Sequence, residues 1–139
     1  MPAKLKVDAQ QWLTFQHTLY RAFGSEGPGA FIEMGGIITG VVLVILVRKR
    51  RPAFYLTLAG ATLLAAAFFL VWIPFVSPVN AETAKWTVDS IPGNWMELRR
   101  QWEYAHTTRF VLQLIGLGAL LLSVLVETPT DRFGGRVAI

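Results

Sequence analysis

The chain has 139 residues, of which 53% are apolar and only 16% are charged. Soluble domains carry about 25% charged residues, so this composition favours a membrane protein, organised as a single domain over residues 1–139. The formal charge of +4 does not indicate nucleic-acid binding, because four of the thirteen basic residues form one run, Arg48–Arg51, directly after an apolar segment. The absence of cysteine excludes disulfides and thiolate metal sites.

Residues 7–23 are predicted to form an amphipathic helix that is too polar to cross a membrane. Polar residues such as Asp8, Gln16 and His17 are interleaved there with apolar ones. The apolar positions are Val7, Trp12, Leu13, Phe15, Leu19, Tyr20 and Phe23. Glycines from Gly24 onward are expected to end this helix.

Three later segments are apolar enough to be predicted membrane spans, at residues 30–47, 53–76 and 109–126. Glu33 is the only charged residue of the first span, in which Gly36 and Gly40 form a small-xxx-small pair suited to close helix contact. The sequence Ser-Pro-Val-Asn at 77–80 is expected to end the second span. The fold class predicted is therefore an all-α integral membrane bundle of three transmembrane helices plus an N-terminal amphipathic helix.

The basic run predicts the orientation of these spans. Cytoplasmic loops carry an excess of Lys and Arg, so the loop at residues 48–52 and the C-terminus are expected on the cytoplasmic side of a bacterial inner membrane. Residues 77–108 and the N-terminal segment then lie outside. Glu33, Asn80, His106 and Arg109 consequently fall at similar depths, near the outer ends of different spans.

Residues 94–126 read as one continuous helix, amphipathic at its start and apolar at its end. Asn94 and Glu97 are spaced as a capping box at its N-terminus. Spacings of three and four place six polar and aromatic side chains on one face of this helix. This polar stripe consists of Trp95, Arg99, Trp102, His106, Arg109 and Gln113.

Glu33 and the polar stripe are the candidates for chemistry. A carboxylate one turn inside an apolar span is costly unless it is paired, neutralised or facing a wet cavity. The alternative is that the helix begins later and Glu33 lies among lipid headgroups. His106 lies one turn after Glu103 and one turn before Arg109, an arrangement that can tune an imidazole to act as a general base. The alternative is an interfacial histidine, with Arg109 bound to a lipid phosphate.

Gln113 favours a protein-facing stripe, because a polar side chain inside an apolar span usually contacts other protein. Trp95 and Trp102 are interpreted either as interfacial anchors or as the walls of a pocket for a flat aromatic ligand. Metal binding by His17, His106 and Glu33 has no supporting ligand spacing, so no metal is expected.

Two of these segments resemble the anthrone-oxygenase-like family of small integral membrane proteins. They are the Ser-Pro-Val-Asn element at 77–80 and the run WMELRRQWEYAHTTR at 95–109, within a resemblance that covers residues 10–126. Many bacterial members of that family are of unknown function. Fungal members are implicated in adding oxygen to anthrones to give anthraquinones without a metal or flavin. The resemblance implies functional roles for Asn80, Trp102, His106 and Arg109, with Glu33 as an addition.

The chain departs from that family in the number of spans. Family members usually have four, and the N-terminal segment here is similar to the segment after the family's first span. Either the chain's start is late, so that it is a four-helix fold lacking its first span, or a neighbouring molecule supplies the missing surface.

The sequence supports two functional hypotheses. The first is a cofactor-independent oxygenase or oxidoreductase acting on a flat phenolic or anthrone-like aromatic. In it, His106 removes a proton, Arg109 and Asn80 stabilise the oxyanion, and Trp95 and Trp102 stack on the ring. Its site residues are His106, Arg109, Asn80 and Glu33 for catalysis and Trp95, Trp102 and Gln113 for substrate binding. The second is a non-catalytic structural or accessory subunit whose polar stripe binds a partner helix. The expected partners are membrane lipid, a hydrophobic aromatic molecule in the first case, and a second copy or another membrane subunit in the second.

Overall fold

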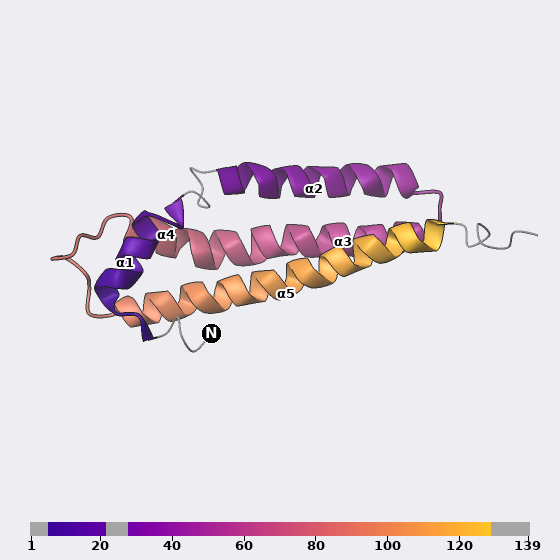
Figure 1. Cartoon of the computed structure of the whole chain (residues 1–139). Coiled ribbons are helices and arrows are strands. Elements are labelled where there is room, and N and C mark those ends of the chain that lie inside the picture. Colours follow the sequence, from indigo (N-terminus) through magenta and orange to yellow (C-terminus); the bar gives the residue numbers. More distant parts are fainter. Residues whose placement is uncertain (1–5, 22–27, 129–139) are drawn as a thin grey trace, which may run out of the picture.

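Three long apolar helices run side by side along the molecule (Figure 1). The structure is a computed structural model that describes residues 6–21 and 28–128, and within that part every regular element is helical. A short helix, α1 (Ala9–His17), precedes α2 (Pro28–Val47), the first long helix. The second long helix is built from α3 (Ala53–Ala66), η3 (Ala67–Val76) and α4 (Ser77–Thr83), and the third is α5 (Trp95–Glu127).

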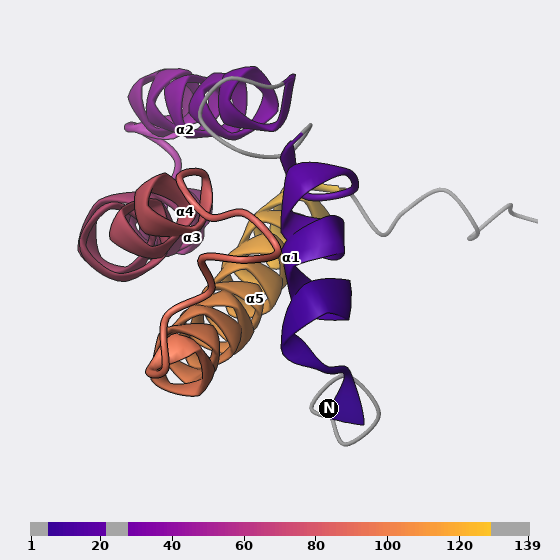
Figure 2. The same cartoon turned by 90° about the vertical axis from the view of Figure 1, so that its left-hand side faces the viewer.

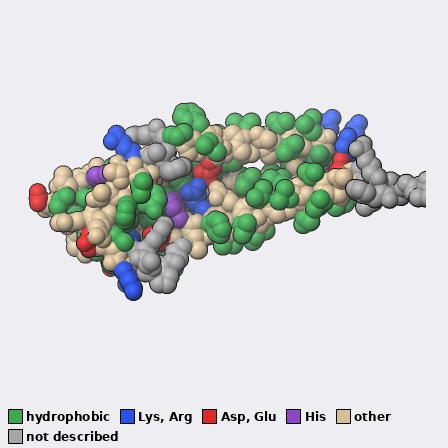
Figure 3. All heavy atoms as spheres, in the orientation of Figure 1, with side chains coloured by type: hydrophobic (Ala, Val, Ile, Leu, Met, Phe, Trp, Pro, Cys, Tyr) green, Lys and Arg blue, Asp and Glu red, His purple; other side chains and the backbone are tan. Residues whose placement is uncertain are grey.

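All three long helices have the length and composition to cross a membrane, as predicted. The third has 33 residues, which at about 1.5 Å per residue exceeds the roughly 30 Å hydrocarbon core of a bilayer. The first turns of α5 therefore extend beyond the apolar part of the bundle. Figure 3 shows hydrophobic side chains along the long helices and charged ones mainly at the two ends.

The second long helix does not end at residues 77–80, where the second span was predicted to end, but continues through them to Thr83. A π-helical stretch, η3, contains Pro74 and leads directly into α4, where Pro78 lies in the first turn. Prolines are tolerated in apolar helices where local π geometry and neighbouring side chains satisfy the backbone groups that they disturb. The side-chain amide of Gln101 donates to the carbonyl oxygen of Phe75 at 3.0 Å in this region.

The long helix α5 begins after Asn94, as predicted, but its cap and the bounds of α1 differ from expectation. Asn94 stands at the N-cap of α5, but its side chain makes no capping hydrogen bond, so the predicted capping box with Glu97 is wrong. Its backbone is nearly helical, with φ −89° and ψ 12°, whereas a capping side chain needs an extended backbone at that position. α1 is shorter than the predicted 7–23 and is capped by Asp8, whose carboxylate accepts from the backbone N–H of Gln11 at 2.8 Å. Residues 22 and 23 lie outside the described part.

α3 is the central helix and packs against both α2 and α5 (Figure 2). Its contact with α5 depends on Gly60 and Gly116, because a Cβ on Gly60 would lie 2.9 Å from the carbonyl oxygen of Gly116. Its contact with α2 is close at Gly40, where an added Cβ would meet Ala61 at 3.2 Å. The predicted close contact is therefore found at Gly40 but not at Gly36, which has no such neighbour within 4 Å.

The main hydrophobic core lies at one end of the bundle rather than along the spans. There α1 crosses the end of the molecule beside α4 and the first turns of α5 (Figure 2). All five tryptophans of the chain belong to this core or pack against it. Its buried members are Trp12, Leu13, Val76, Val79, Trp86, Trp102 and Ala105. This tryptophan core fixes α1 and the loop after α4 onto α5.

At the opposite end, Arg50 and Glu127 form an exposed ion pair with a 2.6 Å N–O distance. The hydrogen bond and the charge of Glu127 raise the pKa of Arg50 above its usual value. The pair joins the loop between α2 and α3 to the end of α5, so the basic run and the end of α5 lie on the same side of the bundle (Figure 1). The predicted cytoplasmic tail after Thr128 lies outside the described residues.

Candidate functional site

A carboxylate, a guanidinium and an amide meet between α2 and α5. The Nη2 atom of Arg109 donates to both carboxylate oxygens of Glu33, at 2.6 Å from each. The side-chain amide of Gln113 donates to Oε1 of the same carboxylate at 3.0 Å. The side chains of Glu33 and Arg109 are only 17% and 14% exposed, so this ion pair is largely buried. We call the three residues the polar triad.

The polar triad explains how a carboxylate resides inside an apolar span. An isolated ion would be strongly disfavoured there, but the charges of Glu33 and Arg109 compensate each other, and Gln113 supplies a further hydrogen bond. The sequence supports this pairing, because Arg109 and Gln113 lie one turn apart on α5 and therefore project to the same side. Figure 3 shows acidic, basic and histidine side chains together between the upper and lower helices, within an otherwise hydrophobic region.

A cavity of about 430 Å³ opens beside the polar triad. We call it the triad cavity. Its polar lining comes from Glu33, His106, Arg109 and Gln113, and its remaining walls are Gly29, Ile32, Gly36, Ile37 and Leu64. Small-molecule sites typically measure about 300–1,000 Å³ and combine apolar walls with a few polar groups, and this cavity has both properties.

The indole ring of Trp102 packs against the imidazole ring of His106. The centres of the two rings lie 4.0 Å apart, with the ring planes inclined at 45°. Trp102 is 2% exposed, its indole N–H donates to Oδ1 of Asn80 at 2.8 Å, and the ring of Tyr20 packs edge-on at 4.8 Å. Trp102 is held by Asn80 of α4 and by Tyr20 in the segment after α1. Its ring in turn positions His106 at the cavity.

The structure separates the predicted site residues into two groups. Glu33, His106, Arg109 and Gln113 line one cavity, whereas Asn80 lines a different one on the α1 side of the bundle. Asn80 therefore does not share a cavity with His106 and Arg109, although the catalytic hypothesis placed Asn80 and Arg109 at the same oxyanion. α4 presents Asn80 toward Trp102 and α1.

Neither tryptophan of the polar stripe lines the triad cavity. Trp102 is buried behind His106, and Trp95 packs against Trp12 at a ring distance of 6.2 Å in the tryptophan core. A direct substrate-stacking role for these two residues at the triad cavity is not supported by this arrangement. Trp102 is buried and Trp95 partly buried because α1 and the loop after α4 cover one face of the first half of α5.

Arg99 and Glu103 are residues whose burial could not be predicted from the sequence. Arg99 is 1% exposed, and its Nη1 donates to the backbone carbonyl of Val7 at 2.7 Å, while its guanidinium lies 5.9 Å from the ring centre of Trp95. Glu103 is 7% exposed. Helical spacing placed Arg99 on the polar stripe, but only the fold shows that its partner is the N-terminal segment.

His17, Glu33 and His106 do not form a metal site, since His17 lies at the α1 end and donates from Nε2 to the carbonyl oxygen of Thr83 at 3.0 Å. In residues 6–21 and 28–128, no three His, Asp or Glu side chains gather closely enough to hold a metal ion. Comparison with protein-family models, with curated proteins and with solved structures found no match for this chain.

Proposed function

We propose that this chain is a membrane-embedded, cofactor-independent oxygenase that acts on a flat phenolic or anthrone-like aromatic in the triad cavity. The observation that carries the proposal is the presence of His106, a general-base candidate, in the same cavity as an arginine that Glu33 holds in place. The resemblance of residues 77–80 and 95–109 to the anthrone-oxygenase-like family supports the same reaction class.

The reaction needs a proton acceptor and an oxyanion stabiliser. An anthrone has a methylene group that is acidic because the anion left by proton loss is delocalised onto the carbonyl oxygen. Its oxidation is R₂CH₂ + O₂ → R₂C=O + H₂O. The methylene carbon loses four electrons to the four-electron reduction of O₂, and its two hydrogens leave in one water molecule. The substrate itself supplies all the electrons, so the protein's part is to form and hold the anion.

Each residue of the cavity then has a distinct role. His106 accepts the proton, and Arg109 stabilises the oxyanion by hydrogen bonding and charge. A guanidinium has five N–H groups, and Nη1 of Arg109 makes no hydrogen bond within the described part of the chain. Glu33 and Gln113 are positioning residues, because they hold Arg109 and each other rather than the reacting atoms. Trp102 positions His106 through its ring contact.

The test uses the purified protein in detergent micelles, with anthrone and dissolved oxygen. Oxygen uptake and quinone absorbance are measured against the rate in micelles without protein. Changing His106→Ala should lower the protein-dependent rate by about 10²–10⁴, the usual effect of losing one acid–base group. The matched control is Tyr104→Ala, on the same helix, whose side chain is 72% exposed and does not line the cavity.

The proposal fails if wild type is no faster than empty micelles with anthrone and its hydroxylated derivatives, or if His106→Ala and Tyr104→Ala behave alike. Melting curves of all three proteins separate loss of activity from loss of fold.

A non-catalytic accessory subunit is the second candidate, and one observation favours it. Ile32 lines the triad cavity and is 73% exposed, and its neighbour Phe31 is 78% exposed. A partner helix lying on this part of α2 would cover the cavity. A photoreactive residue at position 32 should then cross-link to protein in native membranes, whereas cross-linking to lipid alone contradicts the accessory role.

A further inference from the structure

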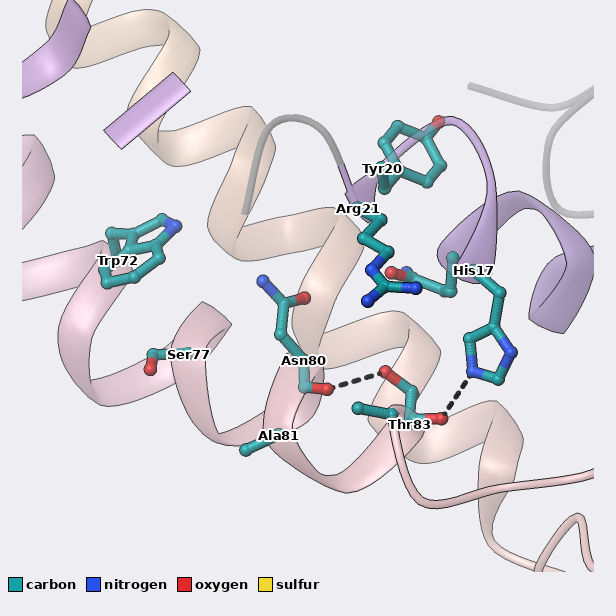
Figure 4. A pocket seen from close by; sticks show the side chains of 10 residues that line it. His17, Tyr20, Arg21, Trp72, Ser77, Asn80, Ala81 and Thr83 are labelled. Carbon is teal, nitrogen blue, oxygen red and sulfur yellow. Dashed lines mark hydrogen bonds between the residues drawn. The ribbon is translucent and has the colours of Figure 1, made fainter. Parts of the chain in front are cut away.

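A second cavity, of about 480 Å³, lies at the α1 end of the bundle and is not used by the proposed reaction. Its walls come from the end of α1, from η3 and from α4 (Figure 4). We call it the α1–α4 cavity. Its lining residues are Gln16, His17, Tyr20, Arg21, Trp72, Ser77, Asn80, Ala81, Thr83 and Ala84.

The polar groups of the α1–α4 cavity are basic or neutral, and none of the described residues that line it is acidic. Arg21 supplies the positive charge, and Figure 4 shows its side chain extending from the segment after α1 toward Asn80 and Thr83. Ser77 is a further polar residue of the lining. A cavity with one guanidinium and several hydrogen-bond donors is suited to an anion.

The amide of Asn80 has a defined orientation. The indole N–H of Trp102 can only donate, so the atom of Asn80 that faces it at 2.8 Å must be the carbonyl oxygen. The NH₂ group of Asn80 is consequently left for other partners. No hydrogen bond joins this NH₂ group to another described residue, so Asn80 brings two donors to the lining of the cavity.

Gln16 gives independent support for a ligand. This residue lines the α1–α4 cavity and is only 7% exposed, yet its side-chain nitrogen is buried without a hydrogen-bond partner among the described residues. A buried donor without an acceptor is unfavourable, and buried polar groups in folded proteins are nearly always hydrogen-bonded. An acceptor oxygen brought by a ligand would satisfy this donor.

The position of the cavity indicates an amphipathic ligand. Trp72 belongs to the apolar part of the second long helix, whereas Ser77 and Asn80 belong to its last turns, beyond the apolar run. The cavity therefore extends from an apolar wall to a polar one. A molecule with an apolar body and an anionic group would match both.

We propose that the α1–α4 cavity binds the carboxylate or phosphate group of an amphipathic molecule, with Arg21, Asn80 and Gln16 as donors and Trp72 against the apolar part. Such a group can come from an anionic phospholipid or from a free aromatic or aliphatic acid. The site is separate from the triad cavity, and Trp102, bonded to Asn80 and in ring contact with His106, stands between them.

The first experiment measures binding of 2-naphthoate by calorimetry to the full chain in neutral detergent, with neutral 2-naphthamide as the comparison ligand. Arg21→Gln should weaken naphthoate binding about tenfold, because a charge-assisted hydrogen bond is lost. Asn80→Asp should weaken it at least as much, since it keeps the oxygen that Trp102 needs but places a negative charge in the site. The control is Arg100→Gln, which makes the same charge change at the same end of the bundle but does not line the cavity.

The second experiment identifies the source of the anion. Native mass spectrometry of protein released from nanodiscs should show retained phosphatidylglycerol, but not phosphatidylcholine, if a lipid headgroup is the ligand, and Arg21→Gln should abolish that retention. Naphthoate binding without lipid retention supports a free acid instead.

The proposal is overturned if naphthoate and naphthamide bind equally and no anionic lipid is retained, or if Arg21→Gln and Arg100→Gln have equal effects in both experiments. These are binding measurements at the α1–α4 cavity, so a negative result leaves the proposed oxygenase activity to be judged by turnover.

Discussion

Arg109 on α5 and Glu33 on α2 are joined across the bundle by one terminal nitrogen that contacts both carboxylate oxygens at 2.6 Å. This ion pair ties the first span to the third, although α3 supplies most of the packing for both. It also defines the polar wall of the triad cavity.

Removing one member of the pair should be more harmful than removing both. Arg109→Leu leaves Glu33 as an uncompensated charge, so we expect the free energy of unfolding to fall by about 3 kcal/mol. The double variant Glu33→Leu with Arg109→Leu should lose clearly less than the sum of the two single changes. Reversible unfolding in mixed detergent and SDS micelles measures all four proteins. Additive losses would show that the two side chains do not interact in the membrane-like state.

The close approach of α3 and α5 should make Gly60 intolerant of any side chain. A Cβ there would lie 2.7 Å from Cγ of Leu120 and 2.9 Å from a backbone oxygen, so Gly60→Ala should destabilise the bundle by about 1–3 kcal/mol. Gly118→Ala is the matched control on α5, because an added Cβ there meets nothing within 4 Å. The control should be neutral or slightly stabilising, since Ala favours helix over Gly. Equal melting temperatures for the two variants would contradict the observed helix crossing.

The hydrogen bond from Trp102 to Asn80 should contribute to stability in a way that a double-mutant cycle can isolate. Asn80→Ala leaves the buried indole N–H without its acceptor, at an expected loss of about 1–3 kcal/mol. In a Trp102→Phe background, Asn80→Ala should lower the free energy of unfolding much less, because phenylalanine has no N–H group that needs an acceptor. Chemical unfolding followed by circular dichroism gives the coupling energy. A coupling near zero would mean that water replaces Asn80 at the indole.

Cysteines introduced at the two ends of the bundle should be accessible to a thiol reagent from opposite sides of the membrane. The chain has no cysteine, so single substitutions can be labelled without background. Lys49→Cys lies in the basic loop and Asp89→Cys in the loop before α5, and both native side chains are exposed. By the positive-inside rule, a membrane-impermeant thiol reagent applied to intact cells should label position 89 and spare position 49. Labelling of position 49 but not of position 89 would show that the orientation is the opposite of the predicted one.

The three spans and the polar stripe could be predicted from the sequence because both depend on local patterns. Hydropathy over about 20 residues identifies a span whatever its neighbours are. Helical periodicity places His106, Arg109 and Gln113 on one face whatever that face meets. Glu33 was also identifiable as a residue in need of a partner, because a charge inside an apolar span demands one. The extension of the second helix through Pro78 was not predictable in this way, since it depends on η3 and on contacts from α5.

Only the tertiary structure shows which of the residues predicted to lie at similar membrane depths contact each other. Depth is given by position along a span, but the direction in which a side chain points depends on how each helix is rotated against its neighbours. That rotation is set by the contacts of Gly60 with Gly116 and of Gly40 with Ala61. They bring Glu33 to Arg109, whereas Asn80, predicted to lie at a similar depth, faces Trp102 and the other cavity. Hydropathy carries no information on rotation about the helix axis, so the sequence could not show that the predicted site residues divide between two cavities.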